Sequence, residues 1–212
     1  MSTASYFDDI ADKWNVIRSE YFEERLRDIA LSKTDISGKI CSDLGCGTGF
    51  ISLALAREAK LVLSVDISGN MLRELNKAAK AESLENLYPI RGFMDDLPLF
   101  DLSVDAVFTN MALHHVENAE KAVREMHRIL KPGGTVVISD VEEHNGYWAI
   151  EEMHDVWLGF SREQLVKWMD GAGFRDIEIS STGLRCKGTS SKGEYTETGI
   201  FVAKGIKREE EQ

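Results

Sequence analysis

Three glycines at alternate positions stand directly behind an acidic residue and a short apolar run. The stretch reads "DLGCGTGF", with Gly45, Gly47 and Gly49 following Asp43. A glycine-rich turn lets a ligand approach the backbone where a Cβ atom would collide. The dinucleotide fingerprint is spaced G-x-G-x-x-G, whereas this stretch is spaced G-x-G-x-G behind a carboxylate that disfavours phosphate. The stretch therefore predicts a turn that binds a ligand with ammonium, sulfonium and carboxylate groups.

A second acidic residue stands where a ribose could be recognised. Asp66 ends the apolar run "LVLSV", about 20 residues beyond the glycine turn, which is the position from which an acid accepts both ribose hydroxyls. Taken with the turn, Asp66 indicates a nucleoside ligand that lacks phosphate.

The elements that must position these residues alternate between strand and helix patterns. Two helices are expected in the first 36 residues, followed by strand and helix patterns in turn, with the helix in "NAEKAVREMHRILKPGG" ended by Pro132 and Gly133. Ser161 and Gln164 predict a capping box at the start of a late helix, and "TGLRCKGTSSKGE" predicts a long mobile hairpin loop. The alternation predicts an α/β fold with helices on both faces of a parallel sheet.

We expect one domain made of five segments. These are an N-terminal helical cap (1–36), a cofactor-binding core (37–141), a lid or substrate insertion (142–160), a C-terminal helix and strands (161–205), and a tail (206–212).

The core resembles the class I S-adenosylmethionine-dependent methyltransferases. The resemblance rests on "DLGCGTG", "SVDIS", "LPLFDLSVDAV", "NMALHHV" and "EMHRILKPGGTVVISD", covers roughly residues 38–140, and is strongest to the ubiquinone and menaquinone C-methyltransferase-like branch. It implies a Rossmann-like seven-stranded sheet with strand 7 antiparallel. It also implies methyl transfer from S-adenosyl-L-methionine to a small organic acceptor, which leaves S-adenosyl-L-homocysteine.

The resemblance also implies roles for individual residues. Asp43 would contact the amino group of the ligand through water or backbone, and Asp66 would bind the ribose. Ile67 and Met71 would flank the adenine ring. The full set of expected cofactor-binding residues is Tyr6, Asp43, Gly45, Cys46, Gly47, Asp66, Ile67, Met71, Met94, Asp95, Asn110 and Met111. Phe7 is a further candidate for the cap over the cofactor, and Trp14 is expected in the core.

One position departs from the family pattern. Relatives commonly carry an aspartate that binds the adenine amine, where this chain has Phe93 in "GFMDDLPLF". Asp95, Asp96 or the backbone at Met94 could supply the acceptor instead.

Histidines and acids supply the candidates for a catalytic base, which is needed only when the acceptor arrives protonated. We expect His115, His144 or His154 in this role, with His114 and the acids Glu142, Glu143 and Asp155 as further candidates. The insertion carries apolar side chains that would contact a substrate, namely Trp148, Trp157 and Phe160. No metal site is expected, because the spacing of His144, His154 and Asp155 does not match helical ligand spacing.

Composition limits the partners. The net charge is −11 over 212 residues, which disfavours nucleic acid, and no apolar run approaches membrane-spanning length. Three cysteines without a CxxC pair indicate reduced thiols, and the acidic N-terminus lacks the pattern of a secretory signal, so we expect a cytoplasmic location. The expected form is a monomer or homodimer, a choice that the sequence does not decide. Two alternatives stay open: a methyltransferase acting on RNA or protein, and a non-catalytic cofactor-binding subunit.

Overall fold

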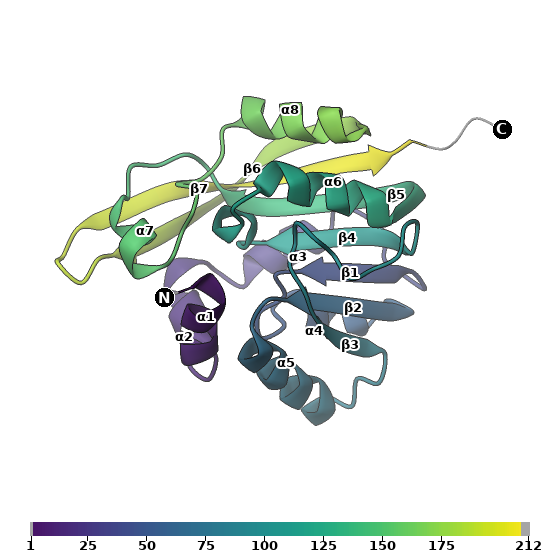
Figure 1. Ribbon diagram of the computed structural model, residues 1–212, viewed down its shortest axis with the longest axis horizontal. Coiled ribbons are helices and arrows are strands. Elements are labelled where there is room, and N and C mark those ends of the chain that lie inside the picture. The colour runs from purple at the N-terminus through teal and green to yellow at the C-terminus, as the bar shows by residue number, and fades with distance from the viewer. Residues whose placement is uncertain (1, 209–212) are drawn as a thin grey trace.

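The computed structural model describes residues 2–208 and places seven strands in one sheet (Figure 1). The strands are β1 (Ile40–Leu44), β2 (Leu61–Asp66), β3 (Leu87–Arg91), β4 (Val104–Asn110), β5 (Leu130–Val141), β6 (Phe174–Thr189) and β7 (Tyr195–Lys207). Their order is β3-β2-β1-β4-β5-β7-β6, and β7 runs antiparallel to both of its neighbours, β5 and β6. This confirms the predicted Rossmann-like sheet with strand 7 reversed.

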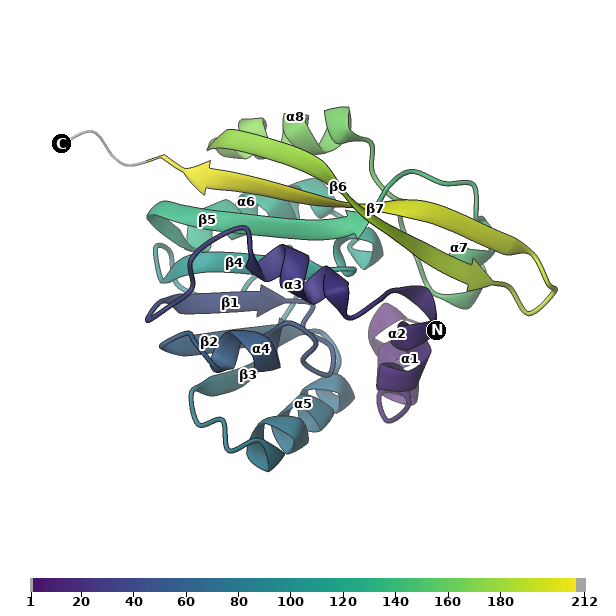
Figure 2. The ribbon, with the colours of Figure 1, turned by 180° about the vertical axis from the view of Figure 1, so that it is seen from behind.

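Helices cover both faces of the sheet because its strands alternate side chains between two cores. Leu44 and Val107 face the core that contains the buried residues of α6 (Ala119–Ile129) and α8 (Arg162–Ala172). Cys41 and Phe108 face the other core. That core is built with α3 (Arg25–Leu31), α4 (Ser52–Ala56) and α5 (Gly69–Ala81), and Figure 2 shows α3 and α4 in front of the sheet.

Short elements gather beyond the carboxyl ends of the parallel strands. There α1 (Thr3–Ile10) and α2 (Trp14–Tyr21) lie next to the 3-10 turn η1 (Leu113–His115) and α7 (Trp148–Glu152). Asp8 ties α1 to the start of α5, since its carboxylate accepts from Ser68 Oγ at 2.6 Å and from the Asn70 amide at 3.0 Å. The N-terminal helices are thereby held over the edge of the sheet where α/β proteins bind ligands.

The predicted start of α8 is confirmed in part. The Ser161 hydroxyl accepts from the Gln164 amide at 3.2 Å, which is one half of a capping box, and Gly173 ends the helix in the left-handed conformation.

Several predicted boundaries are wrong. The N-terminal segment forms three helices rather than two, because Phe22 is extended and breaks the second from the third. α6 ends at Ile129 rather than at Pro132 and Gly133, which lie in β5 instead, where Leu130 already pairs with Val104. Backbone pairing with a neighbouring strand overrides the helix-ending signal of these residues.

The predicted mobile hairpin loop is also wrong in extent. Residues 185–189 pair in antiparallel register with residues 195–199, so most of the Gly- and Ser-rich segment is strand. The turn itself occupies residues 190–194 and is closed by the bond from the Ser190 amide to the Glu194 carbonyl at 2.8 Å. The long hairpin extends beyond the rest of the sheet and packs near α7 and α2 (Figure 1).

The predicted tail, residues 206–212, is partly strand. Residues 206 and 207 of the predicted tail belong to β7, and its last four residues, 209–212, lie outside the described residues. Within residues 2–208, no helix combines the length and apolar character needed to cross a lipid bilayer.

Candidate active site

The glycine turn after β1 is shaped chiefly by the protein's own packing. Gly45, Gly47 and Gly49 all have positive φ, at 69°, 51° and 104°. A Cβ on Gly45 would stand 2.4 Å from Ala112 Cβ, and one on Gly49 would stand 2.4 Å from Leu75 Cδ1. We predicted that a ligand close to the backbone requires these glycines. The backbone conformation and the neighbouring side chains already exclude larger residues here, so they explain the glycines without a ligand.

The amides of this turn are largely bonded within the protein. Gly45 and Cys46 both donate to the Val65 carbonyl, at 2.8 and 3.1 Å, and Gly47 donates to Asp66 Oδ2 at 2.8 Å. A ligand carboxylate cannot use these three amides without breaking existing bonds. The expected cradle of backbone amides is thus mostly occupied by protein acceptors.

A cavity of about 960 Å³ opens in front of this turn. Its size is near the upper end of the usual range for small-molecule sites. Ten of the twelve residues predicted to bind the cofactor line it, all except Tyr6 and Asp43: Gly45, Cys46, Gly47, Asp66, Ile67, Met71, Met94, Asp95, Asn110 and Met111. The structure thus brings together residues from the ends of β1, β2 and β4.

Asp66 lies at the wall of this cavity with both carboxylate oxygens engaged. Oδ2 accepts from the Gly47 amide and Oδ1 from the Ser68 amide, each at 2.8 Å, which leaves lone pairs of each oxygen for further donors. Burial raises the pKa of Asp66 to about 6, against the lowering effect of the two amides. The carboxylate is therefore held in one orientation by the turn that it faces.

Asp43 and Tyr6 lie away from the cavity. Asp43 is buried behind the turn, where Ser52 Oγ donates to it and burial raises its pKa to about 7, so it supports the turn rather than forming the cavity wall. Tyr6 packs its ring 4.6 Å from that of His154, while the adjacent Phe7 lines the cavity. Of the two residues expected to cover the cofactor, Phe7 lines the large cavity and Tyr6 does not.

The predicted adenine end is open and acidic. Phe93 is 58% exposed and lines the cavity together with Asp95 and Asp96. The Asp96 amide donates to the Phe93 carbonyl at 3.3 Å, which closes a tight turn. Because Asp95, Asp96 and Met94 all line this part of the cavity, each remains a candidate for accepting a hydrogen bond from adenine.

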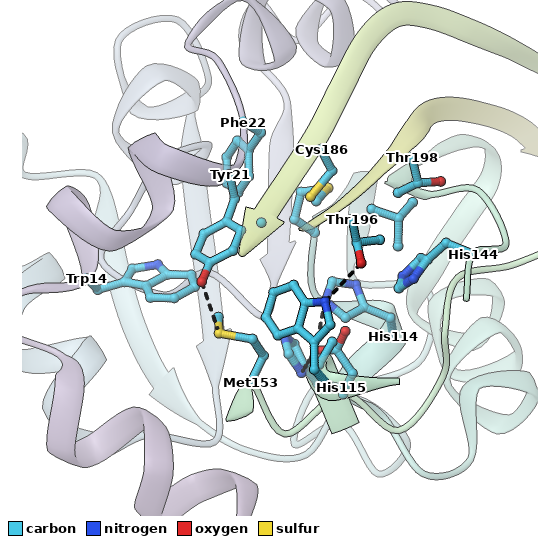
Figure 3. Close-up of a pocket in the computed structure, with 16 residues that line it drawn as sticks. Trp14, Tyr21, Phe22, His114, His115, His144, Met153, Cys186, Thr196 and Thr198 are labelled. Carbon is cyan, nitrogen blue, oxygen red and sulfur yellow. Dashed lines mark hydrogen bonds and ion pairs between the residues drawn. The ribbon is translucent and has the colours of Figure 1, made fainter. Parts of the chain in front are cut away.

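A second, smaller chamber of about 70 Å³ adjoins the large cavity (Figure 3). The two share four wall residues, Trp14, Phe22, Met111 and His115. The chamber wall is mostly apolar, and Figure 3 shows Tyr21 and Phe22 on one side with His114 and His144 on the other. Trp148 closes it from α7, where its Nε1 donates to Thr196 Oγ1 at 2.8 Å.

Histidines and carboxylates form a buried cluster between the two spaces. His114 Nδ1 lies 2.6 Å from Asp140 Oδ1, and His114 Nε2 lies 3.8 Å from Asp155 Oδ1. Burial lowers the pKa of His114, but the attraction of the two carboxylates outweighs it and raises that pKa to about 9. His114 is therefore an imidazolium at neutral pH and cannot act as a base.

His115 has the opposite charge state. Burial and the positive charge of His114 hold its pKa well below the usual value for histidine, so its ring is neutral. Its Nδ1 lies 3.2 Å from the His154 carbonyl and 3.5 Å from Asp155 Oδ1. A proton on Nδ1 that is donated to the carbonyl leaves Nε2 free to accept one.

The ligand atoms of His114, His115 and Asp155 lie within 4.8 Å of one another, a spacing compatible with a metal ion. His114 is protonated between Asp140 and Asp155, so neither of its ring nitrogens has a lone pair for a metal ion at neutral pH. We therefore treat these residues as a proton-handling group.

The other two predicted bases are placed less favourably. His144 lines the small chamber, but its Nδ1 accepts from the Gly146 amide at 3.1 Å, so its Nε2 carries the proton and acts as a donor. The His154 ring packs on Tyr6 and lines neither cavity. Among the three candidates, His115 alone lines both spaces.

The insertion contributes one of its three predicted substrate residues to a cavity wall. Trp148 lines the chamber, whereas Phe160 is 1% exposed and Trp157 packs between Phe160 and Trp168 at ring-centroid distances of 5.8 and 5.6 Å. Trp157 Nε1 donates to the Val116 carbonyl at 2.9 Å. Trp157 and Phe160 thus anchor the insertion to the core beneath α8.

Replacing Trp157 tests this structural role. We expect Trp157→Ala to lower the free energy of unfolding by about 2–4 kcal/mol, because a large, partly buried ring and its hydrogen bond are removed. Urea denaturation measures the change. Affinity for a nucleoside ligand, measured by calorimetry at a temperature where the variant is folded, should stay within about twofold of the unmodified protein. A large loss of affinity at unchanged stability would instead indicate that Trp157 contacts the ligand.

Some wall residues lie outside the sequence-based predictions. Trp14 was expected in the core, yet its ring lines both spaces and its Nε1 would lie 3.2 Å from a Cβ on Gly47. Arg18, four residues later on α2, also lines the large cavity. Their four-residue spacing puts them on one helix face, but nothing in the sequence shows which element that face meets.

Comparisons with known proteins find similarity to methyltransferases. Residues 42–138 match the family model described as a methyltransferase domain. A chloroplastic 2-methyl-6-phytyl-1,4-hydroquinone methyltransferase of Spinacia oleracea is 29% identical over 175 residues, which cover 80% of this chain and 49% of that protein. A demethylmenaquinone methyltransferase of Staphylococcus epidermidis is 33% identical over 144 residues, covering 65% of this chain and 59% of that protein.

Solved structures share the fold. The putative methyltransferase solved in complex with the Haloferax volcanii Trm112 methyltransferase activator superposes with a TM-score of 0.81 at 21% identity over 100% of both chains. At this identity the likeness concerns the fold. The chain spans about half the length of the first curated relatives that it matches. The family model described as a methyltransferase domain thus matches 97 of the 212 residues of this chain.

Proposed function

We propose that this protein transfers a methyl group from S-adenosyl-L-methionine to a small organic acceptor whose nucleophile His115 deprotonates. One observation carries the proposal: His115 lines both the cavity at the glycine turn and the adjoining apolar chamber. A group that removes a proton from the acceptor has to stand at this boundary. The curated relatives named as hydroquinone and demethylmenaquinone methyltransferases support the same reaction class.

The large cavity fits the proposed cofactor. It offers a fixed carboxylate at Asp66 for ribose hydroxyls, apolar walls at Ile67 and Met71 for adenine, and the turn at Gly45 to Gly47. When bound, the cofactor supplies an electrophilic methyl group on a sulfonium sulfur. Met111, with φ of 51° and its amide bonded to the Ser139 carbonyl at 2.8 Å, is held firmly at the boundary with the chamber.

The chain's own residues would position the acceptor and move its proton. Trp14, Tyr21, Phe22 and Trp148 provide an apolar wall that would orient the acceptor, and orientation of reactants can supply much of a rate enhancement. His115 Nε2 would accept the proton of the acceptor's nucleophile, while the cofactor held at Asp66, Ile67 and Met71 would supply the methyl group. Burial and the His114 imidazolium oppose the positive charge that develops on His115, and Asp155 Oδ1, 3.5 Å from its Nδ1, is the carboxylate placed to offset them.

The remaining expectations about the whole protein stand as proposals. We propose that the chain is a single domain with the segments given above, that residues 142–160 act as a lid, and that it works as a monomer or homodimer. A cytoplasmic location is supported by the free thiols of Cys41, Cys46 and Cys186. The solved complex of a structurally similar protein with a Trm112 activator motivates a search for a protein partner of this chain.

Transfer of labelled methyl groups tests the proposed function. The purified protein is incubated with S-adenosylmethionine carrying a tritiated methyl group and with fractionated extracts. We expect the label in a small organic product and not in RNA or protein. Label in a macromolecule would favour the alternative substrate class, and binding of S-adenosylhomocysteine without any transfer would favour a non-catalytic subunit.

A further inference from the structure

We propose that the small chamber binds the ammonium group of an amine, and that this amine is the methyl acceptor. The chamber lies between residues of α2, η1 and α7. The binding of an ammonium group rests on the charge and the walls of the chamber. The identification of the amine as the acceptor rests on the proposed function.

The Asp155 carboxylate is the first feature that points to a cation. Its side chain lines the chamber, is 9% exposed and, with a pKa that burial raises to about 6, is mainly ionised at pH 7. Oδ1 makes both of its ion-pair contacts, to His115 Nδ1 at 3.5 Å and to His114 Nε2 at 3.8 Å, which exceed the length of about 2.7–2.9 Å typical of charge-assisted hydrogen bonds. Oδ2 has no hydrogen-bond or ion-pair partner among the described residues and retains surface that solvent can reach. A nearly buried carboxylate oxygen without a donor marks a place where a ligand can donate.

The net charge around Asp155 is the second feature. Asp140 and Asp155 carry two negative charges and the His114 imidazolium between them carries one positive charge, which leaves one negative charge unbalanced. His115 is neutral, and burial lowers the pKa of His144, so neither ring neutralises that charge. Among the described residues that line the chamber there is no lysine or arginine. Buried charges in proteins are generally paired, so a cationic ligand would complete the cluster.

The aromatic walls of the chamber are the third feature, because aromatic rings attract cations. Four aromatic residues line it: Trp14, Tyr21, Phe22 and Trp148. The Tyr21 hydroxyl donates to Met153 Sδ at 3.2 Å (Figure 3), and Trp148 Nε1 donates to Thr196 Oγ1 at 2.8 Å. Two donors that could bind an anion are thus occupied, while the rings remain as surface for an ammonium group.

The size of the chamber and the position of the base agree with an amine bound by one end. About 70 Å³ is far below the about 300–1,000 Å³ usual for a whole small-molecule site, so the rest of the acceptor would extend into the large cavity, which shares Met111 and His115 with the chamber. An ammonium group arrives protonated, which is the case in which methyl transfer needs a base. One N–H proton would pass to His115 Nε2. The nitrogen lone pair left behind would take the methyl group, which restores the positive charge on nitrogen and leaves S-adenosyl-L-homocysteine.

Three probes of similar shape and different charge test the site: propylammonium, 1-propanol and propionate. Each is titrated into the isotope-labelled full chain, and NMR follows the indole N–H signals of Trp14 and Trp148, which line the chamber. We expect saturable shifts with propylammonium, at an affinity at least about tenfold higher than for 1-propanol, and no saturable shift with propionate. Equal affinities for the three probes, or tighter binding of propionate, would overturn the proposal.

Asp155→Asn keeps the shape of the side chain and removes its charge. Affinity for propylammonium should fall about tenfold or more, while affinity for 1-propanol stays within about twofold. Glu152→Gln is the matched control on the same insertion, because the Glu152 carboxylate accepts from the Ser191 amide and hydroxyl at 2.8 Å each and lines neither cavity. The control should leave every affinity unchanged. An unchanged affinity for propylammonium in Asp155→Asn would contradict the assigned site.

Two substitutions of Tyr21 separate attraction by the ring from apolar contact. Tyr21→Phe keeps the ring, whereas Tyr21→Leu replaces it with an aliphatic side chain. We expect Tyr21→Leu to weaken propylammonium binding about 3- to 10-fold and Tyr21→Phe to change it less than twofold. Equal affinities in the two variants would show that the ring does not attract the cation. Circular dichroism on heating shows whether each variant is folded, and this pair decides on the site if Asp155→Asn is not.

Two further measurements separate this inference from the proposed function. Calorimetry should give Asp155→Asn an unchanged affinity for S-adenosylhomocysteine, and a loss equal to that for propylammonium would assign the chamber to the cofactor's own ammonium group instead. In the labelled-methyl assay, primary and secondary amines should take the label and the matching alcohols and phenols should not. Label in a phenol and in no amine would leave the proposed function standing and make the amine wrong. Binding of propylammonium through Asp155 without any binding of S-adenosylhomocysteine would do the reverse, since the ammonium site would stand and the proposed function would fail.

Discussion

Replacing Asp66 with alanine should weaken binding of S-adenosylhomocysteine by at least about 100-fold. Two ribose hydroxyls would lose a charged acceptor, and each hydrogen bond to a charged group contributes about 1.5–3 kcal/mol, where 1.4 kcal/mol is tenfold in affinity. The Gly47 and Ser68 amides would also lose their partner, which loosens the turn. Calorimetry measures the affinity, and circular dichroism shows whether the fold is kept.

Asp105 offers a control for this substitution. It is a partly buried aspartate at the start of β4, bonded to the Ile40 amide at 2.8 Å and to Lys131 at 2.8 Å, and it does not line either cavity. Asp105→Asn should leave nucleoside affinity unchanged. Unaltered affinity in Asp66→Ala would remove Asp66 from the site, and retention of NADH or ATP in place of S-adenosylhomocysteine would exclude the proposed cofactor.

The raised pKa of Asp66 predicts how binding varies with pH. Burial raises this pKa from 3.8 to about 6, so the carboxyl group becomes protonated as the pH falls through 6 and loses part of its capacity to accept. Affinity for S-adenosylhomocysteine should therefore fall between pH 7 and pH 5, approaching tenfold per pH unit at the lower end. Asp66→Asn should abolish this dependence.

The same shift acts on stability in the opposite sense. A carboxyl group whose pKa is higher in the folded than in the unfolded protein stabilises the fold when protonated. Its contribution is fully present below about pH 3.8 and is lost as the pH rises through about 6. At low pH, the contribution of Asp66 thus favours the ligand-free fold while ligand binding weakens. Melting curves with and without S-adenosylhomocysteine separate the two effects.

Replacing His115 with glutamine should lower kcat by about 100- to 10,000-fold, which is the usual contribution of a positioned acid or base. Glutamine keeps a polar side chain but cannot accept a proton at neutral pH. Affinity for S-adenosylhomocysteine should change little, because the expected effect is on proton removal rather than on nucleoside binding. The assay uses the acceptor that the labelled-methyl experiment identifies, with kcat and KM measured separately.

A second histidine supplies the comparison. His127 lies on α6, where its ring packs 5.0 Å from Phe174, remote from both cavities. His127→Gln should keep full activity. If His115→Gln retains full kcat with an acceptor that loses a proton, then another group removes that proton, and the role assigned to His115 is wrong.

The fold and the ligand end of the strands could be predicted from the sequence because both depend on local patterns. The strand and helix periodicities predicted a sheet with helices on both faces. The carboxyl ends of parallel strands necessarily lie at the same edge of the sheet. Asp66, Asn110 and Met111 thus came together at the cavity wall as expected. The boundaries at Pro132 and in the long hairpin failed because pairing between strands outweighed local turn signals.

The side-chain environments were decided only by the tertiary structure. The sequence shows adjacent histidines at positions 114 and 115, but Asp140 and Asp155, brought from β5 and the insertion, make the first an imidazolium and leave the second neutral. Likewise, the sequence does not reveal that α2 places Trp14 and Arg18 at the wall of the large cavity. Charge state and burial depend on neighbours distant in the chain, and short-range spacing carries no information about those neighbours.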